Sequence, residues 1–596
     1  MNGLLRFLIA LALVAPSVVW AQGEPPPELD LGVDADLPDR LGPWERELAA
    51  DLLEARGRVP AADPDLPVCG VEIVRLDVFT PDDADDLPRW LRFAPRWANA
   101  LHVTTRERTV RRNLTFGVGD TWSDRVARDG ERALRDPYVF STVFTVAMQS
   151  DDPGCVDVLV VTRDVWSLRP SFFLETAGVL TLLHVGVYEA NFAGSGDTVG
   201  VGFDFERGHW ALGPYFVSRR FRGSPFDVYV GADGIRDREL ERPEGGRFVT
   251  TLDVPIRDTS QRWGGGLGFE WSDERIRRYV GPDVATWDAA FTPVDDAVDE
   301  RWRQRRRVAT GRVTRAWGQN VRHLLSPGFR ASDVSAEARP LADVDPVVLA
   351  AFSDERLPRS ETAVGPTLRW ETFVNRHMTI ANYAGFRTGE EIRLGPEASI
   401  SARWAETALG STTRFVDLSA TWWWTLRVGR DGFVRFAAGQ SARALADDRR
   451  WVDLVTSGTL RFVTPSTRGG RLVVRGTALD SRFDEARSFV SLGADTAVRG
   501  YTAGSFFGRN RAIANAEWRT PPLELLTAWW GLVAFYDGGA VWDDGEPITW
   551  VNTLGVGGRV VVPWVDTRVR LLDVGFPLDG PTPGRPVFSI GFDQPF

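Results

Sequence analysis

The chain contains 596 residues, of which 70 are basic and 81 are acidic, so its formal net charge is −11. This length exceeds that of one compact domain, and the negative charge argues against nucleic acid as a partner. The 24 Trp, 34 Phe and 58 Gly residues, with a mean hydropathy of −0.18, suit a β-barrel that has aromatic girdles and a wet interior. A large soluble β-sandwich would have a similar composition.

Residues 1–21 have the pattern of a signal peptide. Met1–Arg6 leads into an apolar run over Phe7–Ala15, and Val19–Ala21 supplies a cleavage site before Gln22. No later segment has the roughly 18 consecutive apolar residues that a membrane-spanning helix requires. We therefore expect an exported chain that can enter a membrane only as a barrel.

Residues 22–68 are rich in Pro, Asp, Glu and Ala. This composition predicts a linker or a loosely docked arm. One short helix is predicted over Trp44–Ala55, and we expect no chemistry in this region.

Residues 69–168 change their hydrophobic period twice, which indicates a small mixed α/β unit. The chain has two cysteines, Cys69 and Cys155, and both lie in this unit. An exported protein meets an oxidising compartment in which such a pair can bond. The predicted elements are a strand over Gly70–Phe79, a helix over Thr105–Leu114, a helix that begins after a Ser123 cap, and two β-rich segments over Tyr138–Met148 and Cys155–Asp164.

Residues 169–596 form a long series of alternating segments of about ten residues, separated by turn residues. The pattern predicts a transmembrane antiparallel β-barrel, and the length accommodates about sixteen strands. The final segment resembles the signal by which outer-membrane barrels are recognised for assembly, with Gln594 as a departure where an apolar residue is usual. The residues that carry this signal on one face are Phe588, Ile590, Phe592 and Phe596.

Three motifs in the predicted barrel point to a known family. The first is a turn at Tyr188–Asp197, near the start of the barrel. The other two are a Val498, Arg499, Gly500, Tyr501 run between two strand patterns and a later strand with Phe535, Asp537 and Gly538. With the element order of residues 69–168, they resemble the BamA/TamA superfamily of outer-membrane assembly and translocation barrels. The resemblance is to members with a single polypeptide-transport-associated (POTRA) domain, and it covers about 70–596.

The resemblance implies roles for several residues. In the family the Val-Arg-Gly-Tyr motif lies on the sixth extracellular loop, which folds into the barrel lumen, and Arg499 is expected to pair with Asp537. A guanidinium in a lumen with restricted water is costly unless it pairs with a carboxylate. An arginine side chain can form two parallel hydrogen bonds with one carboxylate. In the POTRA fold the first and third strands are parallel neighbours, which implies a disulfide between Cys69 and Cys155; two separate buried thiols are the alternative.

The sequence argues against an enzyme. No Gly-x-Ser-x-Gly elbow appears, and the paired carboxylates Glu390 and Glu391 are interpreted as a solvated loop face. We expect no catalysis, no cofactor and no metal. The five histidines have no metal-ligand spacing: His102, His184, His209, His323 and His377.

The function implied by the resemblance is insertion of proteins into, or translocation across, the outer membrane of a diderm bacterium. The POTRA domain would lie in the periplasm and receive polypeptide by β-augmentation. The expected partners are outer-membrane lipids, unfolded or exported polypeptides, and periplasmic or lipoprotein accessory subunits. A dedicated exporter for one secreted protein has the same sequence features. The alternative function is a passive channel or structural barrel without insertase activity.

Overall fold

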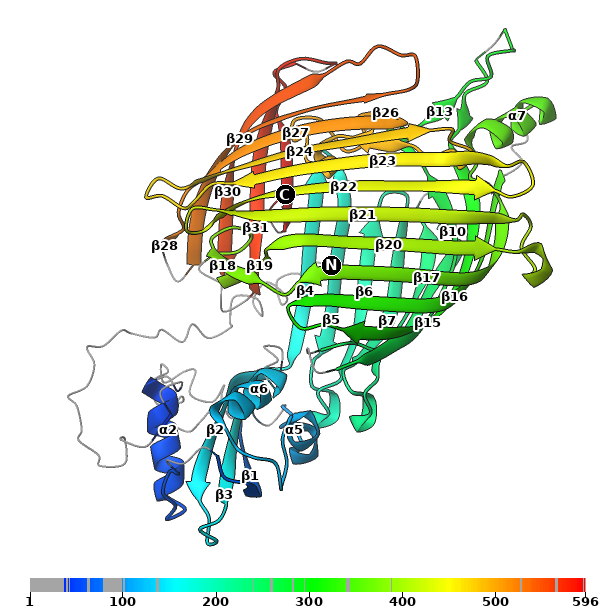
Figure 1. The fold of residues 1–596 in the computed structure, drawn as a ribbon. Helices are drawn as coiled ribbons and strands as arrows, with labels where there is room; N and C mark the ends of the chain where they lie inside the picture. The colour runs from blue at the N-terminus through cyan, green and yellow to red at the C-terminus, as the bar shows by residue number, and fades with distance from the viewer. Residues whose placement is uncertain are drawn as a thin grey trace. The chain divides into compact units, whose positions relative to one another are not determined.

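The computed structural model contains a closed β-barrel and a small α/β unit (Figure 1). It describes residues 37, 38, 41, 43–61, 65–78, 99, 102–134, 139–238, 241–257, 261–280, 283–293, 295–338, 344–386, 389–525, 528–562, 566–581, 583–592 and 594. The predicted signal peptide and Phe596 lie outside the described residues.

The chain divides into two compact units. The first contains residues up to Arg169 together with Glu189–Thr198, and the second contains Pro170–Tyr188 and Val199–Phe596. The predicted Tyr188–Asp197 turn therefore belongs almost entirely to the first unit, although it connects two strands of the barrel.

The first unit is built on a three-stranded sheet in the order β1-β3-β2. Strand β3 is central, parallel to β1 and antiparallel to β2, which is the β-α-α-β-β arrangement expected from the sequence. The elements are β1 (Val68–Leu76), α5 (Glu107–Asn113), α6 (Asp124–Leu134), β2 (Phe140–Gln149) and β3 (Val156–Asp164). Helix α6 begins as predicted, because the Val126 N–H donates to Ser123 Oγ at 3.3 Å.

Both faces of this sheet are covered. Helices α5 and α6 pack on one face through Val110, Ala127 and Leu134. The other face is covered by α2 (Pro43–Glu54), whose Ala49 and Leu53 are buried against apolar side chains of β2 and β3. The predicted helix is thus present, but the arm that carries it is packed into the core rather than loosely docked. The reason is that β2 and β3 are apolar on both faces, so each face needs a cover.

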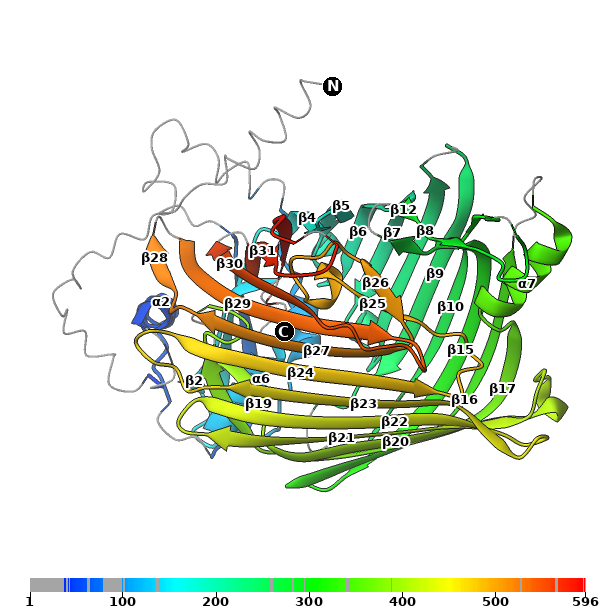
Figure 2. The ribbon, with the colours of Figure 1, turned by 90° about the horizontal axis from the view of Figure 1, so that it is seen from above.

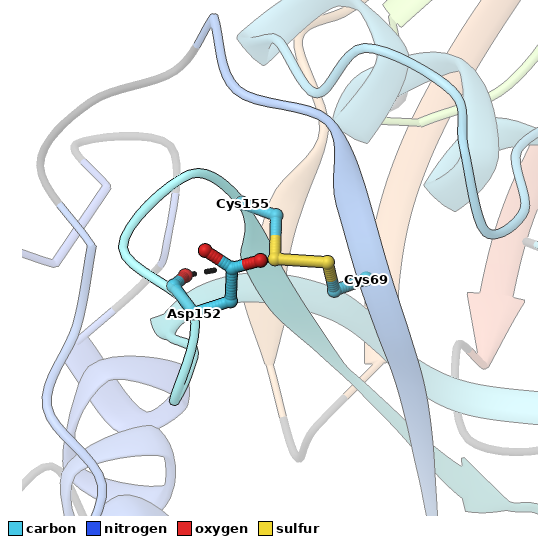
Figure 3. Close-up of side chains that lie close together, drawn as sticks. All are labelled: Cys69, Asp152 and Cys155. Carbon is cyan, nitrogen blue, oxygen red and sulfur yellow. Dashed lines mark hydrogen bonds between the residues drawn. A yellow bond between two sulfur atoms is a disulfide. The ribbon is translucent and has the colours of Figure 1, made fainter.

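Cys69 and Cys155 are joined by a disulfide, with their Cα atoms 5.7 Å apart (Figure 3). Cys69 is the second residue of β1 and Cys155 directly precedes β3, so the parallel pairing brings them to one end of the sheet. The bond closes a separation of 86 residues. Asp152 lies beside it, with its backbone oxygen 3.6 Å from Cys155 Sγ. Because both sulfurs are bonded to each other, this trio has no thiolates to offer a metal ion.

The second unit is a closed antiparallel barrel. Its described strands occupy twenty positions, since β27 and the short β28 pair with the same neighbour, β29. The strands are β4 (Leu168–Ala177), β5 (Leu180–Glu189), β6 (Thr198–Glu206), β7 (His209–Ser218), β8 (Asp227–Asp237), β9 (Pro243–Val254), β10 (Trp263–Arg277), β15 (Arg301–Trp317), β16 (Val321–Ala338), β17 (Glu361–Val374), β20 (Gly395–Ala405), β21 (Phe415–Val428), β22 (Gly432–Leu445), β23 (Arg450–Val463), β24 (Arg471–Arg482), β27 (Asn510–Arg519), β28 (Leu523–Leu525), β29 (Ala528–Trp542), β30 (Val551–Val562), β31 (Asp566–Pro577) and β32 (Val587–Phe592).

The prediction of sixteen strands was therefore wrong, although the class of fold is as predicted. The estimate allowed too many residues for the connections. Several turns are very short, as between β15 and β16 or between β21 and β22, so the same length of chain holds more strands.

The outer surface of the barrel is apolar and its inner surface is polar. On adjacent strands Leu532, Val556 and Leu572 are at least half exposed, whereas Asp537 and Asp573 are completely buried. This alternation places a lipid-compatible surface outside and charged groups inside. No helix in the described part of the chain is both long and apolar enough to cross a membrane.

Two insertions fill part of the lumen. One is a hairpin of β18 (His377–Ala381) and β19 (Gly389–Arg393), between β17 and β20. The other contains β25 (Val490–Leu492) and β26 (Phe506–Gly508), between β24 and β27, and Figure 2 shows it inside the ring of strands. The remaining connections contain β11 (Tyr279–Val280), β12 (Asp283–Val284), β13 (Thr286–Trp287), β14 (Val298–Asp299) and α7 (Pro346–Arg356).

Candidate functional site: an ion-pair cluster in the lumen and the β32–β4 junction

The Val498–Tyr501 motif lies on the insertion between β24 and β27. Successive connections of an antiparallel barrel alternate between its two ends, so this is the eighth connection at its own end rather than the expected sixth. Five strand positions follow it: β27, β29, β30, β31 and β32. A sixth loop in a sixteen-stranded barrel is also followed by five strands. The additional strands therefore all precede the motif.

The backbone at Gly500 brings Arg499 against the barrel wall. Gly500 has φ of 131°, a conformation that side-chain-bearing residues rarely adopt. A Cβ atom there would lie 2.5 Å from Thr553 Cγ2 on β30. Val498 and Tyr501 are buried on either side. The Tyr501 hydroxyl donates to Asp579 Oδ1 at 2.8 Å. Burial is the larger cause that raises the pKa of Tyr501, and this hydrogen bond is the next one, so the hydroxyl stays protonated.

Arg499 meets Asp537, the partner that the family resemblance implies, in a bidentate geometry. Its Nε donates to Asp537 Oδ2 at 2.8 Å and its Nη2 to Oδ1 at 3.1 Å. The backbone N–H of Arg499 also donates to Asp537 Oδ2 at 3.2 Å, and Asn515 Nδ2 donates to Oδ1 at 2.8 Å. The guanidinium carbon lies 3.5 Å from the centroid of the Phe535 ring. Arg499 is only 2 % exposed, so all of these contacts are shielded from solvent.

The pair is part of a larger cluster that sequence reasoning missed. Arg499 Nη1 donates to Glu517 Oε2 at 2.7 Å and to Asp573 Oδ2 at 2.8 Å. Arg519 Nε donates to Glu517 Oε1 at 2.7 Å, and Arg559 Nη2 donates to Asp573 Oδ2 at 3.2 Å. Three arginines thus face three carboxylates, and their charges balance. The members of this lumenal cluster are Arg499, Glu517, Arg519, Asp537, Arg559 and Asp573, all of them buried.

Glycines in β30 and β31 make room for the cluster. A Cβ atom at Gly557 would lie 1.8 Å from Asp573 Oδ1, and one at Gly555 would lie 2.1 Å from the Phe535 ring. At Gly575 a Cβ atom would lie 2.3 Å from the backbone oxygen of Arg499. The sequence pattern of these strands is therefore explained by the close approach of the Arg499 loop to the wall.

The cluster also connects to the β18–β19 hairpin. Arg519 Nη1 donates to the backbone oxygen of Tyr383 at 2.8 Å, and the Tyr383 side chain packs with Phe433 and Ala497. Glu390 holds this turn by accepting from the backbone N–H groups of Tyr383, at 3.2 Å, and of Ala384 and Gly385, both at 2.9 Å. The interpretation of Glu390 as part of a solvated loop face was wrong, because its carboxylate caps a turn.

The first and last strands close the barrel with little pairing. Among the described residues, strand β32 pairs with β4 at two positions, Ser589 with Ala177 and Ile590 with Thr176, and the Gly178 N–H donates to the Phe588 oxygen at 3.2 Å just beyond them. The Ile590 N–H donates to the Thr176 hydroxyl at 3.0 Å instead of to a carbonyl. By comparison, β10 and β15 pair along the whole stretch from Trp263 with Arg315 to Arg277 with Arg301.

The residues of the predicted C-terminal signal lie at this junction. Phe588 and Ile590 are exposed on the outer surface, and Phe592 stacks on Phe173 of β4 with ring centroids 4.8 Å apart. Gln594 accepts a hydrogen bond from Arg559 Nε at 2.9 Å. The polar residue that departs from the expected pattern therefore contacts the lumenal cluster.

The predicted turn near the barrel start is organised by Asn191. This residue is 1 % exposed, and its Nδ2 donates to Thr105 Oγ1 at 2.9 Å and to the backbone oxygen of Val103 at 3.1 Å. The backbone oxygen of Gly194 accepts from the N–H of Arg106 at 2.9 Å. The turn is thus bonded to the segment that precedes α5, within the first unit.

His184, in the first strands of the barrel, has side-chain partners that the sequence did not indicate. His184 Nε2 lies 3.0 Å from Ser171 Oγ, and its Nδ1 lies 2.6 Å from Asp204 Oδ1. The ring fits because a Cβ atom at Gly202 would lie 2.8 Å from His184 Cε1. Ser171 lies within β4, not on the strand-to-helix turn that supplies backbone N–H donors to an oxyanion in a nucleophile elbow.

The fold and site define a class of protein: a closed antiparallel β-barrel with an apolar outer surface, a small α/β unit and a loop held in its lumen by buried ion pairs. No protein-family model and no curated protein sequence matches the chain. Among solved structures, the chain is similar to BamA from Haemophilus ducreyi lacking POTRA domains 1–3, with 12 % identity, 88 % of this chain and 85 % of that chain covered, and a TM-score of 0.39. It is also similar to CdiB from Escherichia coli, with 13 % identity, coverage of 88 % and 76 %, and a TM-score of 0.37. The FrpB iron transporter from Neisseria meningitidis (F5-1 variant) matches at 10 % identity, with coverage of 77 % and 88 % and a TM-score of 0.38.

Proposed function

We propose that the chain is a BamA/TamA-type outer-membrane barrel that assists insertion of proteins into the membrane or their translocation across it. In this proposal the first unit is a POTRA domain in the periplasm, which receives polypeptide. The observation that carries the proposal is the β32–β4 junction, where the described residues form two pairs, whereas strands such as β10 and β15 pair along their whole shared stretch.

The junction can open at little cost. A backbone hydrogen bond contributes about 1 kcal/mol of net stability, so the two pairs, the Gly178–Phe588 bond and one side-chain bond represent only a few kcal/mol. Opening exposes the unpaired edges of β4 and β32, and an exposed strand edge pairs readily with another strand. A strand of an unfolded barrel protein can therefore add to this edge and extend the sheet.

The lumenal cluster supports this role by fixing the wall beside the junction. It joins the Arg499 loop to β27, β29 and β31 through buried, charge-assisted hydrogen bonds. These strands then keep their register while β32 separates from β4. The link from Arg559 to Gln594 extends this support to the end of the chain.

The test is assembly of a small, urea-unfolded outer-membrane barrel by the mature protein in proteoliposomes. We expect faster assembly than with empty liposomes. The double variant Thr176→Cys/Ile590→Cys, oxidised to lock the junction, should lose this acceleration and regain it on reduction. The matched control is Thr459→Cys/Thr477→Cys, which bridges paired residues of β23 and β24 and should stay active.

A passive channel predicts a different result. The wild-type protein would then give steady ion conductance and no acceleration of assembly, and the lock would change neither. That outcome would overturn the proposed insertion function.

A further inference from the structure

The edge of the first unit's sheet at β2 is already occupied by the chain itself. Val59–Ala61 runs beside β2, with Pro60 opposite Met148. The Ala61 N–H donates to the Ala147 oxygen at 3.0 Å, and the Gln149 N–H donates to the Val59 oxygen at 2.9 Å. These three residues therefore act as a short fourth strand, which we call the resident strand.

The resident strand is held by what precedes it and by its own packing, because Pro60 is buried and Ala61 packs against the core on the α5 and α6 side of the sheet. Helix α2 is buried through Ala49 and Leu53, and the N–H of Arg58 donates to the Leu53 oxygen at 3.0 Å. Arg58 Nη1 donates to the Gln149 oxygen at 3.2 Å. Val59 itself is 51 % exposed. Departure of the three residues exposes Pro60 and Ala61 but leaves α2 packed on the sheet, because Ala49 and Leu53 belong to a separate cluster.

Pro60 prevents a further strand from adding outside the resident strand. Because Val59 and Ala61 direct their hydrogen-bonding groups toward β2, the backbone of Pro60 faces the opposite way. Proline has no N–H there, so the outer side of the resident strand is a poor edge for pairing. Natural proteins block exposed edges in this manner.

A buried carboxylate blocks the next position along β2. Glu131 of α6 accepts from the Thr145 N–H at 3.0 Å and from the Thr145 hydroxyl at 2.9 Å. Glu131 is 6 % exposed. Its carboxylate therefore takes the outward amide that an added strand would need, directly beyond the residues paired with the resident strand.

The backbone groups at the opposite edge, at β1, also form hydrogen bonds within the unit. The Val68 N–H donates to the Asp120 oxygen at 2.9 Å, and the Gly119 N–H donates to the Val68 oxygen at 2.8 Å. Arg111 Nη2 donates to the Val71 oxygen at 3.3 Å. Here the covering groups come from α5 and the loop before α6, which also form the core of the unit. Of the two edges, β2 has a stretch, at Ala147 and Gln149, whose hydrogen-bond partners in the described residues belong to no helix, whereas the partners at β1 include Arg111 of α5.

We propose that an incoming polypeptide displaces Val59–Ala61 and pairs antiparallel with β2, so that the resident strand gates the receiving edge. This inference rests on the proposed receiving function and names its site. The partner is an extended segment with alternating apolar residues, such as a strand of an unfolded barrel protein, because pairing with β2 places alternate side chains over the α2 and α6 sides of the sheet.

The experiment measures binding of a fluorescent peptide with the sequence of residues 586–596 to the full mature protein in detergent. Ala61→Pro removes the N–H that donates to Ala147, and Pro60 already has the extended backbone that a following proline requires. Loss of one hydrogen bond should raise peptide affinity about fivefold. Ala61→Ser keeps the N–H and should bind as the wild type does. The oxidised pair Val59→Cys/Gln149→Cys pins the resident strand and should abolish binding, which reduction restores.

The outcomes separate the two claims. Equal binding to wild-type, Ala61→Pro and pinned proteins would overturn the displacement of the resident strand and leave a receiving function at another surface. Absence of binding to all of them, Ala61→Pro included, would overturn the receiving function itself. Reduction of the wild type, which contains the Cys69–Cys155 bond, controls for the effect of the reductant.

Discussion

The wall that carries the lumenal cluster and the wall at the β32–β4 junction are neighbours in the barrel, but different interactions hold them. Strands β29 and β30 pair from Trp529 with Val561 to Gly539 with Val551, and buried ion pairs cross their inner face. Among the described residues, the junction has two residue pairs, a backbone bond from Gly178 to Phe588, a stacked Phe173–Phe592 pair and one bond to a side chain. In the proposed function, the few interactions at the β32–β4 junction would break first, while the strands that carry the lumenal cluster would stay paired.

The largest expected effect comes from a change in the lumenal cluster. Arg499→Ala leaves three buried carboxylates with two arginines, and an uncompensated buried charge typically costs about 3 to 5 kcal/mol. We expect the temperature of the heat-modifiable mobility shift on gels to fall sharply and assembly activity to be lost, while the first unit stays folded. Arg427→Ala is the control, because Arg427 is exposed and donates to backbone oxygens of its own turn. An Arg499→Ala protein with unchanged mobility shift and activity would contradict the role of the cluster.

A smaller effect is expected from filling the space beside the cluster. Gly557→Ala places a methyl group 1.8 Å from Asp573 Oδ1, and overpacking of this kind costs about 1 to 3 kcal/mol. Gly558→Ala, one residue further on, meets nothing within 4 Å and should be close to neutral. Urea-unfolding midpoints in detergent would compare the two variants. Equal midpoints would show that the cluster tolerates displacement.

The junction should respond to the residue that links it to the cluster. Gln594→Ala removes the hydrogen bond from Arg559, and loss of about 1 kcal/mol corresponds to roughly fivefold faster amide exchange in β32. Gln594→Glu turns this hydrogen bond from a cationic donor into an ion pair and should slow exchange there. Hydrogen exchange measured by mass spectrometry, with β15 as the internal reference, checks both directions. Identical exchange in the two variants would show that the bond between Gln594 and the cluster does not stabilise the junction.

The smallest effect is expected at the Ser171–His184–Asp204 row, which lies in the first strands of the barrel. Ser171→Ala should change stability by no more than about 0.5 kcal/mol, because the three side chains are partly exposed. The wild-type protein should not be labelled at Ser171 by a fluorophosphonate probe. Labelling that disappears in both Ser171→Ala and His184→Ala would instead reveal an activated serine and refute the expectation of no catalysis.

Local features of the fold were predictable from the sequence, and assembled features were less so. The Ser123 cap and the helix over Pro43–Glu54 depend on neighbouring residues, and both appear close to their predicted positions. The number of strands depends on how many residues each turn consumes, which alternation alone does not give. The packing of α2 on the sheet also escaped prediction, because a Pro-rich, acidic flank masks the apolar side chains that the second face of the sheet requires.

The candidate site likewise has a part that was predicted and a part that only the structure revealed. The Arg499–Asp537 pair was predicted through resemblance, whereas Glu517, Arg519, Arg559 and Asp573 became partners only in the structure. A signal for them did exist, since charged residues at inward positions of apolar strands stand out once the register is known. The register itself follows from pairing between strands, which no single segment encodes.

The sequence by itself determined that this chain forms a barrel and a small α/β unit, because period-two alternation and turn residues are local. The inward-facing arginine motif and the Cys69–Cys155 bond were expected from the family resemblance. Only the tertiary structure decided which charges neutralise one another, how weakly the first and last strands meet, and that Val59–Ala61 covers the edge of β2. Those properties depend on register and burial, which bring together residues far apart in the chain and are fixed only when all strands are in place.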